Sequence, residues 1–175
     1  MLIARYIRTG ALAVSLVAIF DATAIAEPQE IGRFNDWRAY VDGADAKKIC
    51  FIGSAPTKAE GKYTQRGQTY VLITHRPGDS PPTQGEVSVE AGYSYKPDSE
   101  VSVDINGKTF KLFTRDGNAW ARDPQSDKAL VQAMRAGNEM VIKGTSSRGT
   151  LTTDTYSLLG FTAAYESIGK ACGVH

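Results

Sequence analysis

The sequence predicts a mainly β fold, an antiparallel β-sandwich or a half-open barrel with two short helices. Stretches rich in β-branched and aromatic residues recur along the chain and are separated by turns that contain Gly, Pro, Asn or Asp. One of these turns, Asn106-Gly107, stands between two stretches in which apolar and polar residues alternate, as in a tight hairpin. Only two stretches, one between Asp123 and Gly137 and one from Phe161 to Cys172, have the spacing of an amphipathic helix.

Residues 1–26 have the features of a signal peptide. Arg5 and Arg8 precede an uncharged apolar run, and Ala24-Ile-Ala26 is the small-x-small pattern that signal peptidase accepts. The apolar run is shorter than the roughly 20 residues that a spanning helix needs, so cleavage is favoured over retention as a membrane anchor. We therefore expect residues 27–175 to be exported as a single soluble domain, with no membrane-spanning segment left after cleavage.

The charge of the exported part is balanced. Cleavage removes Arg5, Arg8 and Asp21 from a total of 20 basic and 19 acidic residues, which leaves 18 of each. A nucleic-acid-binding protein would show a clustered basic excess, and adhesion to an anionic membrane would need one as well. The composition therefore argues against both kinds of partner.

The expected strands share a β-favouring composition and are bounded by turn residues. They are residues 36–41, 48–54, 68–75, 86–91, 100–105, 108–113, 119–121 and 139–145, followed by a Thr-rich run that begins at residue 150. Three polar stretches with Gly or Pro are expected to be loops: residues 27–35, 54–67 and 76–85. Folding the hairpin about its Asn-Gly turn places Val103 opposite Phe110 and Val101 opposite Leu112, so these apolar side chains share one face.

The first helix has clear signals at both ends. Asp123 is a suitable N-cap, Pro124 suits the first helical position, and Gly137 is expected to end the helix as a C′ residue. Between them, Leu130 and Met134 belong to an apolar stripe, which predicts that this helix packs on the sheet.

The second helix carries an apolar face that ends in a cysteine. The members of this face recur at offsets of three and four: Phe161, Ala164, Tyr165, Ile168 and Cys172. The other cysteine of the chain, Cys50, lies in a short apolar run near the opposite end. Two cysteines in an exported protein most simply form one disulfide, which here ties the last helix to an early strand. Two free thiols, or pairing between chains, are the alternatives.

The titratable residues show no catalytic pattern. His75 is the one credible general base, because the other histidine, His175, is the last residue. A hydrolytic triad also needs a nucleophile and an orienting acid, and the sequence has no Gly-x-Ser-x-Gly elbow. The acidic residues are scattered singly, and two cysteines with scattered histidines do not make a zinc site. We expect no enzyme activity, no cofactor and no metal site, with a hydrolase that uses His75 as the alternative.

The segment Gly92-Tyr-Ser-Tyr-Lys-Pro97 is the best candidate for a contact surface. Tyr93, Tyr95 and Lys96 stand in a turn-rich stretch, and tyrosine supplies rigid amphipathic contact area. Together with Arg76 they are the candidate contacts for a ligand or a protein partner. The alternative is that one of the tyrosines simply covers an end of the sheet.

The segment Ser157-Leu-Leu-Gly-Phe-Thr-Ala-Ala164 carries a resemblance to a known family. It matches the Ser-Leu-x-Gly-Phe-x-x-Ala signature of the invasion-associated locus B family at Ser157, Leu158, Gly160, Phe161 and Ala164. The early Trp37, the Lys48-Ile-Cys50 segment, the late Cys172 and the signal peptide complete a resemblance that covers roughly the whole exported chain.

The resemblance implies a small envelope or secreted protein of alphaproteobacteria, named for a role in host-cell invasion and without established catalytic activity. We therefore expect a periplasmic, secreted or outer-surface protein that acts by binding a protein partner in the envelope or on a host cell, in invasion or in envelope maintenance. A periplasmic module that binds a small molecule or a glycan is the alternative.

Overall fold

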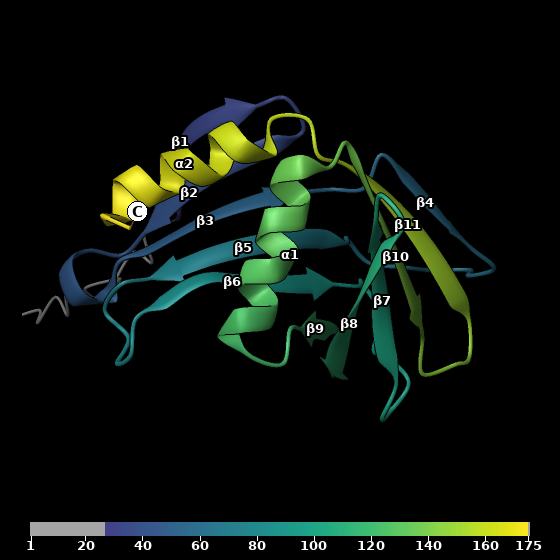
Figure 1. Cartoon of the computed structure of the whole chain (residues 1–175). Coiled ribbons are helices and arrows are strands. Elements are labelled where there is room, and N and C mark those ends of the chain that lie inside the picture. The colour runs from purple at the N-terminus through teal and green to yellow at the C-terminus, as the bar shows by residue number, and fades with distance from the viewer. Residues whose placement is uncertain (1–26, 175) are drawn as a thin grey trace, which may run out of the picture.

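The computed structural model describes residues 27–174 as one antiparallel sheet of eleven strands with two α-helices (Figure 1). The elements are β1 Gln29–Phe34, β2 Trp37–Asp42, a short 3-10 helix Asp45–Lys47, β3 Ile49–Ser54, β4 Lys58–Gly61, β5 Tyr70–Arg76, β6 Thr83–Glu90, β7 Glu100–Ile105, β8 Lys108–Arg115, β9 Asn118–Trp120, α1 Pro124–Ala136, β10 Glu139–Thr145, β11 Leu151–Ser157 and α2 Phe161–Cys172. The mainly β fold with two helices is confirmed. The signal peptide expected at residues 1–26 lies outside the described residues.

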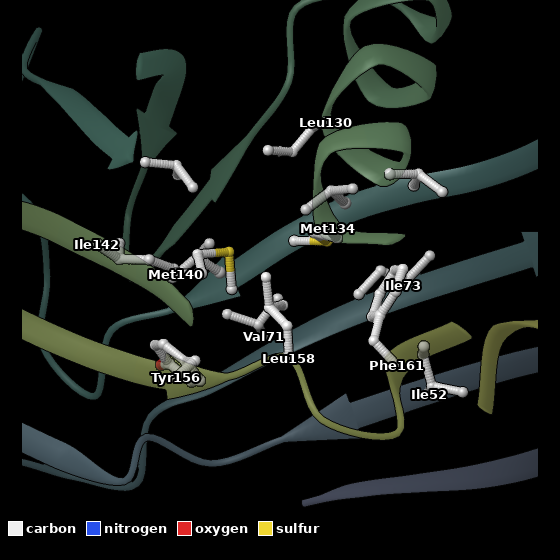
Figure 2. Packing of buried hydrophobic residues seen from close by; sticks show 14 of the residues in the cluster. Ile52, Val71, Ile73, Leu130, Met134, Met140, Ile142, Tyr156, Leu158 and Phe161 are labelled. Atoms are coloured by element: carbon white, nitrogen blue, oxygen red, sulfur yellow. The ribbon is translucent and has the colours of Figure 1, made fainter. Parts of the chain in front are cut away.

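The sheet is open and bent on itself. Its strand order is β1-β2-β3-β5-β6-β9-β8-β7-β10-β11-β4, and β7, β10 and β11 turn away from the direction of β2, β3 and β5 (Figure 1). Met140 of β10 and Tyr156 of β11 are thereby brought into one buried cluster with Val71 and Ile73 of β5 (Figure 2). Of the two expected architectures, the half-open barrel describes this single sheet better than a sandwich of two sheets.

The hairpin of β7 and β8 has the register that the sequence predicts. Val103 pairs with Phe110 and Val101 pairs with Leu112 across the Asn-Gly turn. Three of these side chains are buried, whereas Phe110 is half-buried. Turn chemistry and apolar alternation agree here, so local sequence alone defines the pairing.

Helix α1 packs on β6 and begins as expected. The Asp123 carboxylate accepts a hydrogen bond from the Ser126 amide at 2.8 Å, with proline in the first turn. Gly137 ends the helix, but its φ of −96° is not left-handed, so it is not the expected C′ conformation. A Cβ at Gly137 would lie 2.6 Å from Ile105 Cγ2 and 2.9 Å from Leu158 Cδ1. Crowding by these two side chains, rather than backbone conformation, requires the glycine.

Helix α2 lies along β1, β2 and β3 and is bonded to the sheet (Figure 1). Cys172, its last residue, forms a disulfide with Cys50 of β3, so the expected intramolecular bond is confirmed. The Lys48 ammonium also donates to the Ala171 carbonyl at this end of the helix. Closing a loop with a sequence separation of 122 residues stabilises a domain by about 2–4 kcal/mol.

The other end of α2 explains the Ser157–Ala164 motif. The Phe161 ring meets the buried Trp37 ring edge-on at 5.0 Å, and Trp37 Nε1 donates to the Ser157 carbonyl at 3.0 Å. Gly160 has a φ of +89°, and a Cβ there would lie 2.1 Å from the Phe34 carbonyl oxygen. Only glycine fits a turn that is both left-handed and pressed against β1.

Three expectations for loops are wrong in part. Residues 27–35 contain β1, residues 54–67 contain β4, and β6 begins at Thr83. Strands β1 and β4 are the two ends of the sheet, and their side chains are mostly exposed. Without a buried face they show no apolar alternation, so their composition resembles that of a loop.

Neither helix of the described chain is long and apolar enough to cross a membrane.

Candidate functional site

The four candidate contact residues do not form one surface. Arg76 lies at one end of β5 and pairs with Glu86 at 2.8 Å, whereas Tyr93 lies beyond the opposite end of that strand. Tyr95 is 6% exposed, and its backbone bridges to Ser146, so it covers the sheet as the alternative interpretation has it. Lys96 is exposed on the next turn. Tyr93 alone lines a groove, where it is half-buried.

The side chain of Arg66 contacts Tyr93 and binds Asp154, and the sequence did not identify Arg66 as a site residue. Its guanidinium donates two parallel hydrogen bonds to the Asp154 carboxylate, Nη1 to Oδ1 and Nη2 to Oδ2, both at 2.6 Å. Arg66 Nε donates to the Ala91 carbonyl at 2.7 Å. Both side chains of the ion pair are 5% exposed. Burial disfavours the cation, but the hydrogen bonds and charge of Asp154 outweigh it and raise the pKa of Arg66 above its ordinary value.

One sequence signal points to this ion pair. Asp154 occupies an inward position of β11, between the buried side chains of Thr152 and Tyr156. A carboxylate at such a position needs a cationic partner, because an unpaired buried charge is strongly unfavourable. The partner stands in an irregular segment almost ninety residues earlier, which no local pattern identifies.

Two tyrosine rings lie close to the Arg66 guanidinium. Its Cζ atom is 5.1 Å from the ring centroid of Tyr93 and 5.6 Å from that of Tyr63, within the range of cation–π attraction. The Tyr93 hydroxyl hydrogen-bonds the Thr152 hydroxyl at 2.7 Å, and its ring meets Tyr95 edge-on at 5.2 Å. The ion pair and these rings fix the irregular segment to β11.

An open groove of about 950 Å³ runs beside this cluster, and we call it the Arg66 groove. Its walls are the segment of residues 62–67, the turn of residues 92–94, and the turn of residues 146–150 together with Thr152 of β11. Every charged side chain that the described residues contribute to its lining is basic: Lys62, Arg66 and Arg148. Arg66 is neutralised by its partner, so Lys62 and Arg148 supply the free positive charge of the groove.

A second open groove, of about 900 Å³, runs along helix α1, and we call it the α1 groove. It lies between α1, the loop that enters β6 and the end of β9. The rings of Phe113 and Trp120, 5.8 Å apart, lie half-buried in its lining. Arg115 and Lys128 are exposed there and form no ion pair with another residue of the described chain.

A buried carboxylate also lines the α1 groove. Asp127 is 8% exposed, and its Oδ1 accepts a hydrogen bond from the Val87 amide at 2.8 Å. Burial outweighs this hydrogen bond and raises the pKa of Asp127 to about 6. Within residues 27–174, no group of three or more His, Cys, Asp or Glu side chains is placed to hold a metal ion.

His75 is fully buried, beside the disulfide. It is the cross-strand neighbour of Cys50, and its ring meets Tyr165 of α2 edge-on at 5.1 Å. Its Nδ1 accepts a hydrogen bond from the Gly85 amide at 3.0 Å, and its Nε2 has no hydrogen-bond partner in the described part of the chain. Burial lowers the pKa of His75 to about 4. A general base has to reach a substrate, so this placement argues against the hydrolase alternative.

The comparisons with known proteins agree with the architecture. The crystal structure of invasion associated protein b from Bartonella henselae matches with a TM-score of 0.55 and 14% sequence identity, over 83% of this chain and 97% of that chain. At this identity the match shows a common fold. No curated protein matches the sequence. The family model described as invasion associated locus B (IalB) protein matches residues 37–169, which include the Ser157–Ala164 motif. This chain therefore belongs to the invasion associated locus B (IalB) protein family.

Proposed function

We propose that this chain is an exported, non-enzymatic protein of the bacterial envelope that binds a protein partner through the α1 groove. The observation that carries the proposal is the make-up of this groove. It combines the half-buried rings of Phe113 and Trp120 with the exposed cations Arg115 and Lys128, which have no ion pair within residues 27–174. Aromatic and arginine side chains are the types enriched at the centres of protein interfaces.

The length of the α1 groove favours a peptide segment over a small molecule. Its lining follows α1 from Asp123 to Arg135, a helical distance of about 18 Å. An extended segment of about five or six residues spans that length. Arg122 and Arg135 are each paired with a glutamate, so Arg115 and Lys128 are the lining cations without an ion pair among the described residues. The carboxylates of Asp123 and Asp127 also belong to the lining, at the start of α1. The segment that fits best has an apolar or aromatic anchor and at least one acidic residue.

Three observations support export and a role without catalysis. A disulfide is typical of proteins that fold in an oxidising compartment outside the cytoplasm. The first 26 residues have the pattern of a signal peptide. His75, the candidate base, is buried and its Nδ1 is engaged by the backbone. The family name favours host-cell invasion as the setting in which the partner is bound, with envelope maintenance as the other setting.

Site-specific photo-cross-linking in the native bacterium tests this proposal. A photoreactive amino acid at Trp120 or Lys128 is expected to trap the same partner. The matched control positions are Leu159 and Leu151, which are 63% and 60% exposed and do not line the α1 groove. Equal yields of one adduct from control and groove positions, or no adduct from either groove position, would contradict the proposal. A deletion strain complemented with a Trp120→Ala variant then separates a loss of host-cell entry from a loss of envelope integrity.

A further inference from the structure

The Arg66 groove presents the positive charges of two exposed side chains, Lys62 and Arg148. Lys62 and Arg148 are exposed and form no ion pair with another residue in the described range 27–174. The described residues that line the groove include no carboxylate, and the carboxylate of Asp154 is held by Arg66 with both oxygens. A ligand with at least one negative charge is therefore favoured at this groove.

The frame of the groove is fixed before any ligand arrives. The Gly67 amide donates to the Gly92 carbonyl at 2.8 Å, and the Ser147 amide donates to the Ser94 carbonyl at 2.8 Å. Together with the Arg66 ion pair, these bonds hold all three walls in place. Gly92, with a φ of +71°, lies so close to the first wall that a Cβ would be 2.3 Å from the Gly67 oxygen. The backbone of a groove built in this way loses little conformational entropy on binding.

The surface of the groove is rich in hydroxyl groups and includes one accessible aromatic ring. Ser94 and Ser147 are exposed, and Thr150 is half-buried. The Tyr63 ring is 37% exposed beside the buried guanidinium of Arg66. A sugar presents hydroxyl groups at its edge and C–H groups on its faces. Hydroxyls beside an aromatic face therefore suit a sugar, whereas an inorganic anion can use the charges and the hydroxyl groups but not the aromatic face.

We infer that the Arg66 groove is a binding site for an acidic oligosaccharide, with the negative groups paired with Lys62 and Arg148 and one sugar ring lying on Tyr63. Its volume of about 950 Å³ lies within the range of ~300–1,000 Å³ typical of ligand sites. The even balance of 18 basic and 18 acidic residues in the exported chain disfavours nucleic acid as the polyanion. The polar lining of this groove also distinguishes it from the α1 groove, on which the proposed protein partner depends.

Calorimetric titration of the disulfide-bonded protein, residues 27–175, tests this inference with three probes. Trigalacturonate is expected to bind with a dissociation constant of about 1 mM or tighter, and maltotriose, which has no charge, at least about tenfold more weakly. Inorganic phosphate is expected to bind at least about tenfold more weakly than trigalacturonate as well. In amide NMR spectra, trigalacturonate is expected to shift residues 62–67, 92–94 and 146–150. Undetectable binding of trigalacturonate, or equal affinity for phosphate, overturns the inference.

Matched variants locate the site. Lys62→Gln and Arg148→Gln are each expected to weaken trigalacturonate binding about tenfold, since each removes a charge-assisted hydrogen bond. Tyr63→Ala removes the ring and is expected to weaken binding of every sugar. Lys128→Gln removes a cation from the α1 groove and is expected to leave affinity unchanged. Full affinity in the Lys62→Gln, Arg148→Gln double variant overturns the inference, and cross-linking at Trp120 is expected to persist in that variant.

Discussion

Arg66 and Asp154 form a bidentate ion pair that is almost completely removed from solvent and joins an irregular segment to strand β11. The pair lies beneath the Arg66 groove, and the Arg66 guanidinium is close to two tyrosine rings. Each charge is acceptable in the interior only because the other is present. The integrity of this region therefore depends on both residues together.

Removal of one partner is expected to destabilise the protein strongly. Asp154→Ala leaves a buried guanidinium without its counter-ion, which costs about 3–5 kcal/mol in the free energy of unfolding. Glu60→Gln breaks the exposed pair with Lys58 and is expected to cost less than about 1 kcal/mol. Urea unfolding measures both values. Equal losses in the two variants would show that the buried pair is not the anchor of this segment.

The disulfide is expected to be intramolecular and stabilising in solution. Mass measurement of the native protein should show no alkylated thiol before reduction and two after it, in a monomeric species. A Cys50→Ser, Cys172→Ser variant is expected to lose about 2–4 kcal/mol of unfolding free energy, because the loop between strand β3 and helix α2 is no longer closed. Alkylation of two thiols in the unreduced native protein would refute the bond.

Replacement of Gly160 by alanine is expected to destabilise the protein more than replacement of Gly149, although both glycines have a left-handed backbone conformation. Gly160→Ala forces a Cβ against the Phe34 carbonyl at a φ of +89° and is expected to cost about 3 kcal/mol or more. Gly149 has a φ of +81°, but a Cβ at this residue would meet no heavy atom of the described residues within 4 Å, apart from its chain neighbours, so Gly149→Ala is expected to cost about 1 kcal/mol. Thermal unfolding compares the two, and a similar loss in both would contradict the packing argument.

His75 and Asp127 are expected to oppose each other in the pH dependence of stability. The pKa of His75 is about 4 in the folded protein and about 6.5 when unfolded, so protonation favours the unfolded state. The contribution of the neutral ring to the unfolding free energy is therefore complete above pH 6.5 and is lost as the pH falls towards 4. The pKa of Asp127 is about 6 in the folded protein and about 3.9 when unfolded, so ionisation favours the unfolded state. The contribution of the protonated carboxyl to the unfolding free energy is therefore complete below pH 4 and is lost as the pH rises to 6. Each effect amounts to about 3 kcal/mol.

Single variants separate these two contributions. In Asp127→Asn only His75 remains, so the unfolding free energy is expected to rise between pH 4 and 6.5. In His75→Gln only Asp127 remains, so the unfolding free energy is expected to fall between pH 4 and 6. The natural chain is expected to be nearly level over the same interval. Denaturant titrations at several pH values measure the slopes, and identical slopes in all three proteins would show that neither group titrates abnormally.

Local patterns are sufficient to predict much of the fold. The Asn106-Gly107 turn determines the β7–β8 register, and the spacing of the α2 face together with two cysteines predicts the disulfide. The end strands β1 and β4 escape prediction because strands without a buried face carry no apolar period. Gly137 ends its helix as predicted but for a different reason, since its neighbours Ile105 and Leu158 come from distant parts of the chain.

The candidate sites are less accessible to sequence reasoning. The sequence identifies Tyr93, but the neighbouring Arg66 stands in a stretch expected to be a loop, and Arg76, expected to act with Tyr93, lies at the opposite end of β5. The α1 groove has no sequence signal because Phe113, Trp120 and Lys128 come from three separate elements. Grooves of this kind depend on the bend of the sheet, which local sequence patterns do not predict.

The most direct test of the proposed binding function is the yield of photo-cross-linked partner from Trp120 relative to Leu159 in the native envelope. We predict one dominant adduct from Trp120, little or none from Leu159, and loss of the Lys128 adduct when Trp120 is replaced by alanine in the same chain. Equal yields from Trp120 and Leu159, or no adduct from Trp120, would contradict the assignment of the α1 groove as the protein-binding surface.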